Sequence, residues 1–196
     1  MAGRATSGTL THWFREHFAK DLTLETSFGE LSKEAALSAP GANGLVFLPY
    51  FSGERTPIHD PDAKGVLFGL RLDHTRGDIY RGLIEGIAFG TRHVVDTFVE
   101  SGTKTNQFFA VGGGTKNELW LQTTSDITGF DQIVREKTVG ASYGDAFLAA
   151  LAVGMVKPSK ISVWNPTERT VRSENDAALE HNYAIFKNLY TLTKDL

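Results

Sequence analysis

The chain has 196 residues, 41% of them hydrophobic and 22% charged, and its formal net charge is −3. This length suits one domain with a sizeable core, and the balance of apolar and charged residues excludes a disordered chain. The absence of cysteine excludes a disulfide framework, a thiol nucleophile and a cysteine-bound zinc site. The first residues lack the apolar stretch of a signal peptide, so we expect a cytoplasmic location.

The composition also argues against two classes of partner. The basic residues are scattered along the chain, so it lacks the basic patch with which proteins bind nucleic acid. The longest apolar run, residues 147–156, is shorter than the roughly 18 residues that a membrane helix needs. We therefore expect neither a nucleic acid nor a membrane as a partner.

The first 44 residues predict two helices and a turn. Apolar residues spaced by three and four, from Leu10 to Phe18, predict a helix over residues 8–19. Ser27 followed by Glu30 resembles a capping box that opens a second helix, which ends near residue 37. The segment SAPGANG, residues 38–44, predicts a turn.

Two buried strands are predicted next. The runs GLVFLPYF, residues 44–51, and GVLFGLRL, residues 65–72, are continuously apolar and bounded by glycine or proline, and we expect them to pair antiparallel. The loop between them contains HDPD, residues 59–62, but its acids do not have EF-hand spacing. The six histidines form no HExxH pair and no GxSxG elbow is present, so we expect no metal site and no serine nucleophile.

Residues 75–101 predict the longest helix. One apolar stripe runs from Ile79 to Phe98, and a second stripe holds Gly82, Gly86 and Gly90. Each glycine costs about 1 kcal/mol relative to alanine in a helix, so three on one face predict close backbone approach to a neighbouring element. Charged residues interrupt this run, which excludes a membrane-dimer motif.

The last third alternates between strands and helices. We expect strands at residues 107–111 and 132–136, and helices at 117–127, 141–153 and 177–192. Small residues in the second of these helices, such as Ala141, Gly144 and Ala149, predict tight packing. A β-α-β-α order implies parallel strands with right-handed crossovers. The whole order is the outline of a ribonuclease-H-like α/β domain, with a mixed sheet and helices on both faces.

Two helix starts carry glycine and predict anion binding. In AVGGGTKNELWLQ, residues 110–122, a strand ends in three glycines before a helix, and backbone N–H groups there attract phosphate. These glycines are equally typical of a tight turn. Asn117, one turn inside the helix, is either a base contact or a solvated polar residue. In ATSGTLTHW, residues 5–13, Thr6 or Ser7 caps the helix and Gly8 exposes backbone donors.

Five segments in order resemble the C-terminal half of the FGGY carbohydrate kinases, most closely the xylulokinase-type members. The resemblance runs from about Gly3 to Gly154 and rests on TSGTLTHWFRE, GLVFLPYFSGERTPIHDPDAKGVLFGL, DIYRGLIEGIAFGTRHVVD, AVGGGTKNELWLQTTSDITG and GASYGDAFLAALAVG. Residues 65–85 also resemble the family's second signature. They depart from it at Gly82, where the pattern prefers alanine or serine, and at Leu83.

The resemblance implies one domain of a two-domain kinase with an actin-like ATPase fold. Residues 1–196 would form the C-terminal ATP-binding domain, and the missing N-terminal domain would supply the sugar pocket, the catalytic aspartate and most Mg²⁺ ligands. No catalytic residue is therefore assigned to this chain. The positions that match the family's ATP or ADP contacts are Gly8, His12, Gly112, Gly113, Gly114 and Asn117. The sugar in the intact enzyme would be xylulose or a related sugar or polyol.

Three functions follow as hypotheses. The first is the nucleotide-binding half of a sugar kinase, inactive in isolation. The second is a stand-alone nucleotide-binding or regulatory module, and the third is an interaction domain that has lost nucleotide binding. A domain that normally faces a partner exposes apolar surface, so we also expect that the chain can self-associate as a homodimer.

Overall fold

The computed structural model describes residues 6–105, 107–174 and 176–196. The helices are α1 (Gly8–Phe18), α2 (Ser27–Ala36), α3 (Arg76–Glu100), α4 (Glu118–Thr128), α5 (Ala141–Ala152), α6 (Ile161–Trp164) and α7 (Ala177–Thr193). The strands are β1 (Val46–Leu48), β2 (Val66–Phe68), β3 (Phe108–Ala110), β4 (Gln132–Arg135) and β5 (Thr167–Val171). Short 3₁₀ turns cover Ala42–Gly44, Gly113–Lys116 and Pro158–Lys160. The start of the family resemblance at Gly3 lies outside the described residues.

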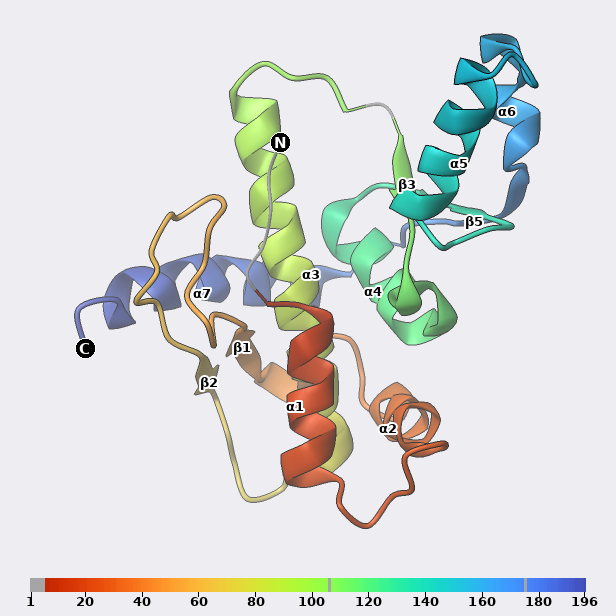
Figure 1. Ribbon diagram of the computed structural model, residues 1–196. Helices are drawn as coiled ribbons and strands as arrows, with labels where there is room; N and C mark the ends of the chain where they lie inside the picture. Colours follow the sequence, from red (N-terminus) through yellow and green to blue (C-terminus); the bar gives the residue numbers. More distant parts are fainter. Residues whose placement is uncertain (1–5, 106, 175) are drawn as a thin grey trace.

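The strands form two sheets. β1 and β2 pair antiparallel, as predicted, with Phe47 opposite Leu67. β4 is the central strand of a mixed sheet: it runs parallel to β3 and antiparallel to β5. Figure 1 shows the long helix α3 (green) between the β1–β2 pair and the three-stranded sheet with α4. β5 was not predicted, because its segment TERTV is mostly polar and exposed.

Strand β1 separates two hydrophobic clusters. Val46 and Leu48 pack with residues of α3 and α7, whereas Phe47 packs on the other side with residues of α1, α2 and α3. Side chains alternate between the two faces of a strand, so a strand buried on both faces reads as a continuous apolar run. This arrangement confirms the predicted burial for residues 45–50, although the strand itself is shorter. The predicted burial of residues 65–72 is wrong: Val66 and Leu67 are half-buried and Phe68 is exposed, because β2 is an edge strand that pairs with β1 alone.

Glycines on α3 allow the helix to approach β1. A Cβ at Gly86 would overlap the carbonyl oxygen of Phe47 and would lie 2.9 Å from its Cβ. A Cβ at Gly82 would lie 3.4 Å from the Cβ of Leu45, which is a close but tolerable contact. The predicted close approach is therefore confirmed at Gly86, whereas the contact at Gly82 leaves room for a small side chain.

Two predicted local features differ in the structure. The capping box at Ser27 is wrong: Thr26 is the N-cap of α2, and the Ser27 and Glu30 N–H groups donate to Thr23 and Thr26 carbonyls instead. The backbone satisfies these donors, so no side chain needs to. A capping box does occur at α3, where Thr75 and Asp78 bond reciprocally.

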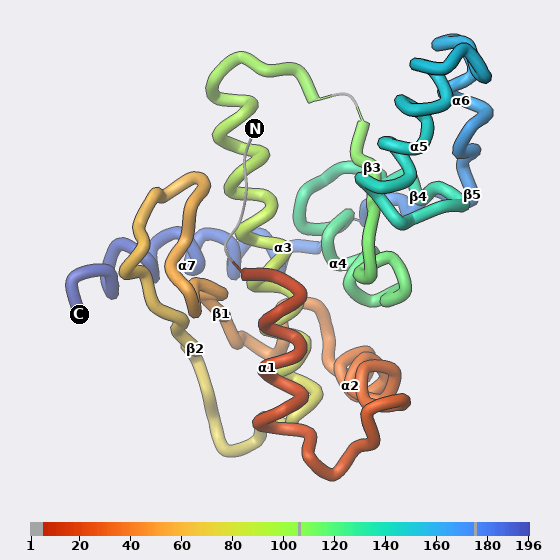
Figure 2. Tube along the Cα trace, in the orientation of Figure 1, coloured from red at the N-terminus to blue at the C-terminus, as the bar shows by residue number. Residues whose placement is uncertain are grey.

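The predicted tight packing of α5 is also wrong. Ala141, Gly144 and Ala149 are exposed, and Phe147 is the buried residue of this helix. The reason is that α5 and α6 extend away from α3, at the upper right of Figure 2. Several large apolar side chains on this part of the molecule are exposed: Leu148, Val153, Met155, Ile161 and Val163.

A left-handed turn precedes β1 and is held by polar contacts. Gly41, Ala42, Asn43 and Gly44 all have positive φ, a conformation that costs free energy for the two non-glycine residues. The Gly41 N–H donates to Glu85 Oε1 at 2.9 Å, and its carbonyl accepts from the Asn182 amide at 2.9 Å. These contacts connect the turn to α3 and α7.

Glu85 is fully buried beside this turn. Its Oε1 also accepts from Arg81 Nε at 2.9 Å, whereas Oε2 has no partner among the described residues. Burial raises the pKa of Glu85 to about 7, although the ion pair with Arg81 and the Gly41 N–H oppose that rise. Folding therefore favours proton uptake by this carboxyl.

We predict a pH-dependent contribution of Glu85 to stability. A folded-state pKa above the unfolded value of 4.5 means that the stabilisation is fully present below pH 4.5 and is lost as pH rises towards 7. The difference in free energy of unfolding between wild type and Glu85→Gln, measured by urea titration, should decrease over this range. A difference that stays constant from pH 4.5 to pH 7 would contradict the prediction.

Helix α7 completes the core although it follows the segments that carry the family resemblance. Phe186 is fully buried against β1 and α3 residues, with its ring 5.6 Å from that of Phe89. At the surface, Arg92 of α3 bonds both carboxylate oxygens of Glu180 and lies over the ring of Tyr183. α7 is thus joined to α3 by apolar packing and by an ion pair.

We predict that truncation of Phe186 destabilises the whole chain. Phe186→Ala should lower the free energy of unfolding by about 3–5 kcal/mol, because it leaves a cavity in the core. The matched control on the same helix is Leu192→Ala, whose side chain is exposed and whose loss should cost less than about 0.5 kcal/mol. Equal unfolding free energies for the two variants would show that α7 is not part of the core.

Candidate functional site

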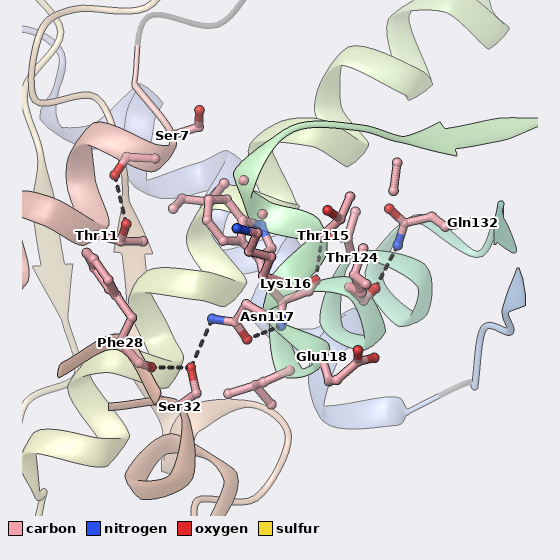
Figure 3. A pocket seen from close by; sticks show the side chains of 18 of the residues that line it. Ser7, Thr11, Phe28, Ser32, Thr115, Lys116, Asn117, Glu118, Thr124 and Gln132 are labelled. Carbon is pink, nitrogen blue, oxygen red and sulfur yellow. Dashed lines mark hydrogen bonds between the residues drawn. The ribbon is translucent and has the colours of Figure 1, made fainter. Parts of the chain in front are cut away.

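A cleft of about 1150 Å³ lies where α1, α2, the end of β3 and the start of α4 meet. Figure 3 shows side chains from these elements around it. Five of the six residues predicted from the sequence line this cleft: Gly8, His12, Gly113, Gly114 and Asn117. The sixth, Gly112, directly precedes Gly113 in the chain and is not among the lining residues. Segments more than 100 residues apart in the sequence are thereby brought to one site.

The glycine loop, residues 112–114, follows β3 and exposes its backbone. Gly112 has φ of +85°, which favours glycine, and its N–H donates to the Thr138 carbonyl at 2.6 Å. A Cβ at Gly113 would meet no atom within 4 Å. The α-helix does not open directly after the glycines as predicted, because a 3₁₀ turn over Gly113–Lys116 comes first and Thr115 Oγ1 donates to the Gly112 carbonyl at 2.7 Å.

Helix α1 directs its N-terminus to the same cleft. Ser7 is its N-cap residue, but the Ser7 side chain makes no capping hydrogen bond, and Thr6 Oγ1 donates to the Pro49 carbonyl. The prediction that one of these hydroxyls caps the helix is therefore wrong. A helix N-terminus without a side-chain cap keeps backbone donors available and carries a partial positive charge. Ser7 and Gly8 both line the cleft.

Asn117 is the N-cap of α4 rather than a residue of its first turn. Its Oδ1 accepts from the Trp120 N–H at 3.1 Å. Its Nδ2 donates to Ser32 Oγ at 2.9 Å. The predicted free amide is thus partly engaged, because an N-cap side chain turns back to satisfy the helix donors.

Helix α2 supplies a wall of the cleft that the sequence did not predict. Phe28, Gly29 and Ser32 of α2 line the cleft, and the ring of Phe28 packs edge-on against His12 at 5.0 Å. The guanidinium of Arg15 lies 5.6 Å from the centre of the same ring. Phe28 and Ser32 are one helical turn apart, so the sequence places them on one face of α2. Only the position of α4 in the fold shows that this face lines the cleft.

The charges at the cleft favour binding over acid–base chemistry. Lys33 and Lys116 are cations among the lining residues. Glu118 is the one carboxylate among the described lining residues, and it pairs with Arg169 at 2.5 Å. The arrangement can hold an anion at the glycine loop and a planar group beside Phe28 and Asn117.

The described residues contain no cluster of acidic and histidine side chains of the kind that binds a metal through several protein ligands. No group of three or more histidine, aspartate or glutamate side chains is placed to hold an ion there. In the HDPD loop, the Asp60 carboxylate is engaged: it accepts from the Asp62 N–H at 2.9 Å and from the Tyr190 hydroxyl at 2.9 Å. None of the described helices is long and apolar enough to cross a membrane.

Comparison with known proteins shows which family this chain resembles in sequence. Residues 1–153 match the model of the C-terminal domain of the FGGY family of carbohydrate kinases. Xylulose kinase of Bacillus subtilis (strain 168) is 33% identical over 204 residues, covering 100% of this chain and 39% of that protein. The chain therefore spans about two fifths of the length of this relative.

Solved structures share the fold. The crystal structure of xylulose kinase from Rhodospirillum rubrum matches with a TM-score of 0.85 at 29% identity, over 98% of this chain and 39% of that one. Plasmodium falciparum glycerol kinase with ADP matches with a TM-score of 0.77 at 26% identity, over 94% of this chain and 36% of that one. The expected ribonuclease-H-like α/β fold of the actin-like ATPases is confirmed. The chain belongs to the FGGY family of carbohydrate kinases.

Proposed function

We propose that this chain is the nucleotide-binding half of an ATP-dependent sugar kinase. The observation that carries the proposal is the convergence of two glycine-marked helix starts, at Gly8 and Gly113, on one cleft. The acceptor would be a hydroxyl of xylulose or a related sugar or polyol, by analogy with the xylulose kinases among its relatives. Use of ATP also favours a cytoplasmic location.

The phosphates of ATP or ADP would lie between the two helix starts. The open backbone at Gly113 and the N-terminus of α1 both offer N–H donors to an anion, and glycine lets the phosphates approach the chain closely. Gly112 and Gly114 would shape this loop. Lys116, on the 3₁₀ turn, would add positive charge.

The base would lie at the other end of the cleft. Phe28 and His12 offer apolar and aromatic surface there, and Asn117 offers an amide that can bond a base edge. ADP in a related kinase of the same fold supports a nucleotide as the ligand. The residues present therefore fit a nucleotide in size and in polarity.

The rest of the reaction would require groups from a second domain. Phosphoryl transfer depends on positioning and on charge stabilisation, and a base must accept the proton of the sugar hydroxyl. The one carboxylate lining the cleft, among the described residues, is held by Arg169. We infer that an N-terminal domain supplies the catalytic aspartate, the sugar pocket and most ligands of Mg²⁺.

A non-catalytic nucleotide-binding or regulatory module is the second candidate. The cleft offers contacts for phosphate and base, and the one carboxylate among its described lining residues pairs with Arg169, as a module that binds without turnover would also show. The two candidates share nucleotide binding and differ in whether the chain gives turnover when it is joined to a second, sugar-binding domain. An interaction domain without nucleotide binding is separated from both by the first experiment below.

We predict that the chain binds ADP and that Gly113→Val weakens this binding by about tenfold or more, which corresponds to about 1.4 kcal/mol. The valine side chain would occupy the space through which phosphate approaches the loop. The matched control is Gly144→Val, because Gly144 also has no atom within 4 Å of its Cβ position but lies on α5, outside the cleft lining. Isothermal titration should show wild-type affinity in the control. Absence of ADP binding in wild type would favour the interaction domain.

We also predict that this chain alone has little or no kinase activity. A coupled assay with ATP, Mg²⁺ and xylulose, repeated with a panel of sugars and polyols, should give no turnover above that without protein. Robust phosphorylation of any sugar would contradict the inference that a second domain supplies the catalytic aspartate and the sugar pocket. It would show that the catalytic base lies in this chain.

A further inference from the structure

A chain of three hydrogen bonds joins α2 to the start of α4 at the inferred base end of the cleft. The Trp120 N–H donates to Asn117 Oδ1, and Asn117 Nδ2 donates to Ser32 Oγ. The Ser32 hydroxyl in turn donates to the Phe28 carbonyl at 2.7 Å. Figure 3 shows Asn117 and Ser32 facing each other beside Phe28.

These bonds fix which way the Asn117 amide points. The Trp120 N–H can only donate, so Asn117 must present its oxygen to it. The single proton of Ser32 is used on the Phe28 carbonyl, so Ser32 can only accept from Asn117, which must present its nitrogen. A flipped amide would place two donors and two acceptors face to face. The Trp120 N–H and Ser32 thus set the orientation of the amide together, one at its oxygen and one at its nitrogen.

The fixed amide retains part of its hydrogen-bonding capacity. Its oxygen has a second lone pair and its nitrogen a second proton, and Asn117 lines the cleft. One donor beside one acceptor complements adenine, which presents an amino group next to a ring nitrogen. Guanine presents two acceptors, O6 and N7, on the corresponding edge, and one of them would face the Asn117 oxygen.

We propose that Ser32 is a positioning residue for base recognition, which holds the Asn117 amide in the orientation that accepts adenine and rejects guanine. The inference rests on the proposed function, because it assigns the base end of the same nucleotide cleft. Ser32 acts through Asn117 and need not touch the nucleotide. The alternative is a purely structural role, in which Ser32 only clamps α2 against α4.

The two roles differ in their effect on the choice of base. Removal of the hydroxyl leaves the Trp120 N–H as the one remaining bond of this chain that orients the amide, so Ser32→Ala should weaken ADP binding by about fivefold to tenfold and change GDP binding by less than about twofold. A lost clamp would instead weaken both nucleotides equally, because it would widen the cleft for any ligand. The ratio of GDP to ADP dissociation constants is therefore the informative readout.

The experiment measures ADP and GDP affinity by isothermal titration for wild type, Ser32→Ala and the control Thr97→Ala. Thr97 makes the same bond to the carbonyl four residues earlier, but on the exposed end of α3 and away from the cleft lining. Wild type and control should prefer ADP by about tenfold or more, and Ser32→Ala should lose most of this preference. An unchanged preference in Ser32→Ala overturns the inference.

A second variant tests whether Ser32 works through Asn117. Asn117→Asp keeps an acceptor for the Trp120 N–H, and so keeps the helix cap, but it removes the donor to Ser32. Adding Ser32→Ala to this variant should leave the ratio of GDP to ADP dissociation constants unchanged. A further change in that ratio would overturn the inference. If wild type binds ADP and either result goes against Ser32, the proposed function survives; if wild type binds neither nucleotide, both fail.

Discussion

The contact between α3 and β1 at Gly86 is the constraint on which the rest of the structure depends. Because Gly86 has no side chain, the helix can lie directly against the Phe47 carbonyl, where any Cβ would overlap it. This approach lets α3 contribute to both hydrophobic clusters, one on each face of β1. The glycine lowers helix propensity by about 1 kcal/mol, and the burial of two clusters outweighs that cost.

The same helix organises the cleft. α1 and α2 pack in the cluster that contains Phe47 and the first half of α3, so their ends are held at a fixed place relative to α4. The N-terminus of α1, the glycine loop and α2 then face one cavity. The elements that line the cleft are therefore held in place by the same apolar cluster. The position of a second domain would complete the cleft.

Sequence periodicity predicted the long helices and the antiparallel β1–β2 pair, because burial of an apolar face dominates their formation. It missed β5, whose residues are mostly polar and give no apolar pattern, and it wrongly predicted tight packing for α5, whose small residues do not reveal how far the helix extends. At the site, glycine and helix starts indicated Gly8 and Gly113. Ser32 was missed because its contact with Asn117 spans 85 residues and exists only after folding.

We propose that one cleft, bounded by α1, α2 and the glycine loop, binds a nucleotide. Backbone amide chemical shifts, followed by ¹H–¹⁵N NMR during titration with ADP, test this binding, because residues on each wall of the cleft give separate signals. We expect the largest chemical-shift changes at Gly8, Gly29, Gly113 and Trp120, and little change in α5 and α6. Changes confined to α5 and α6, or no saturable change at all, would contradict it.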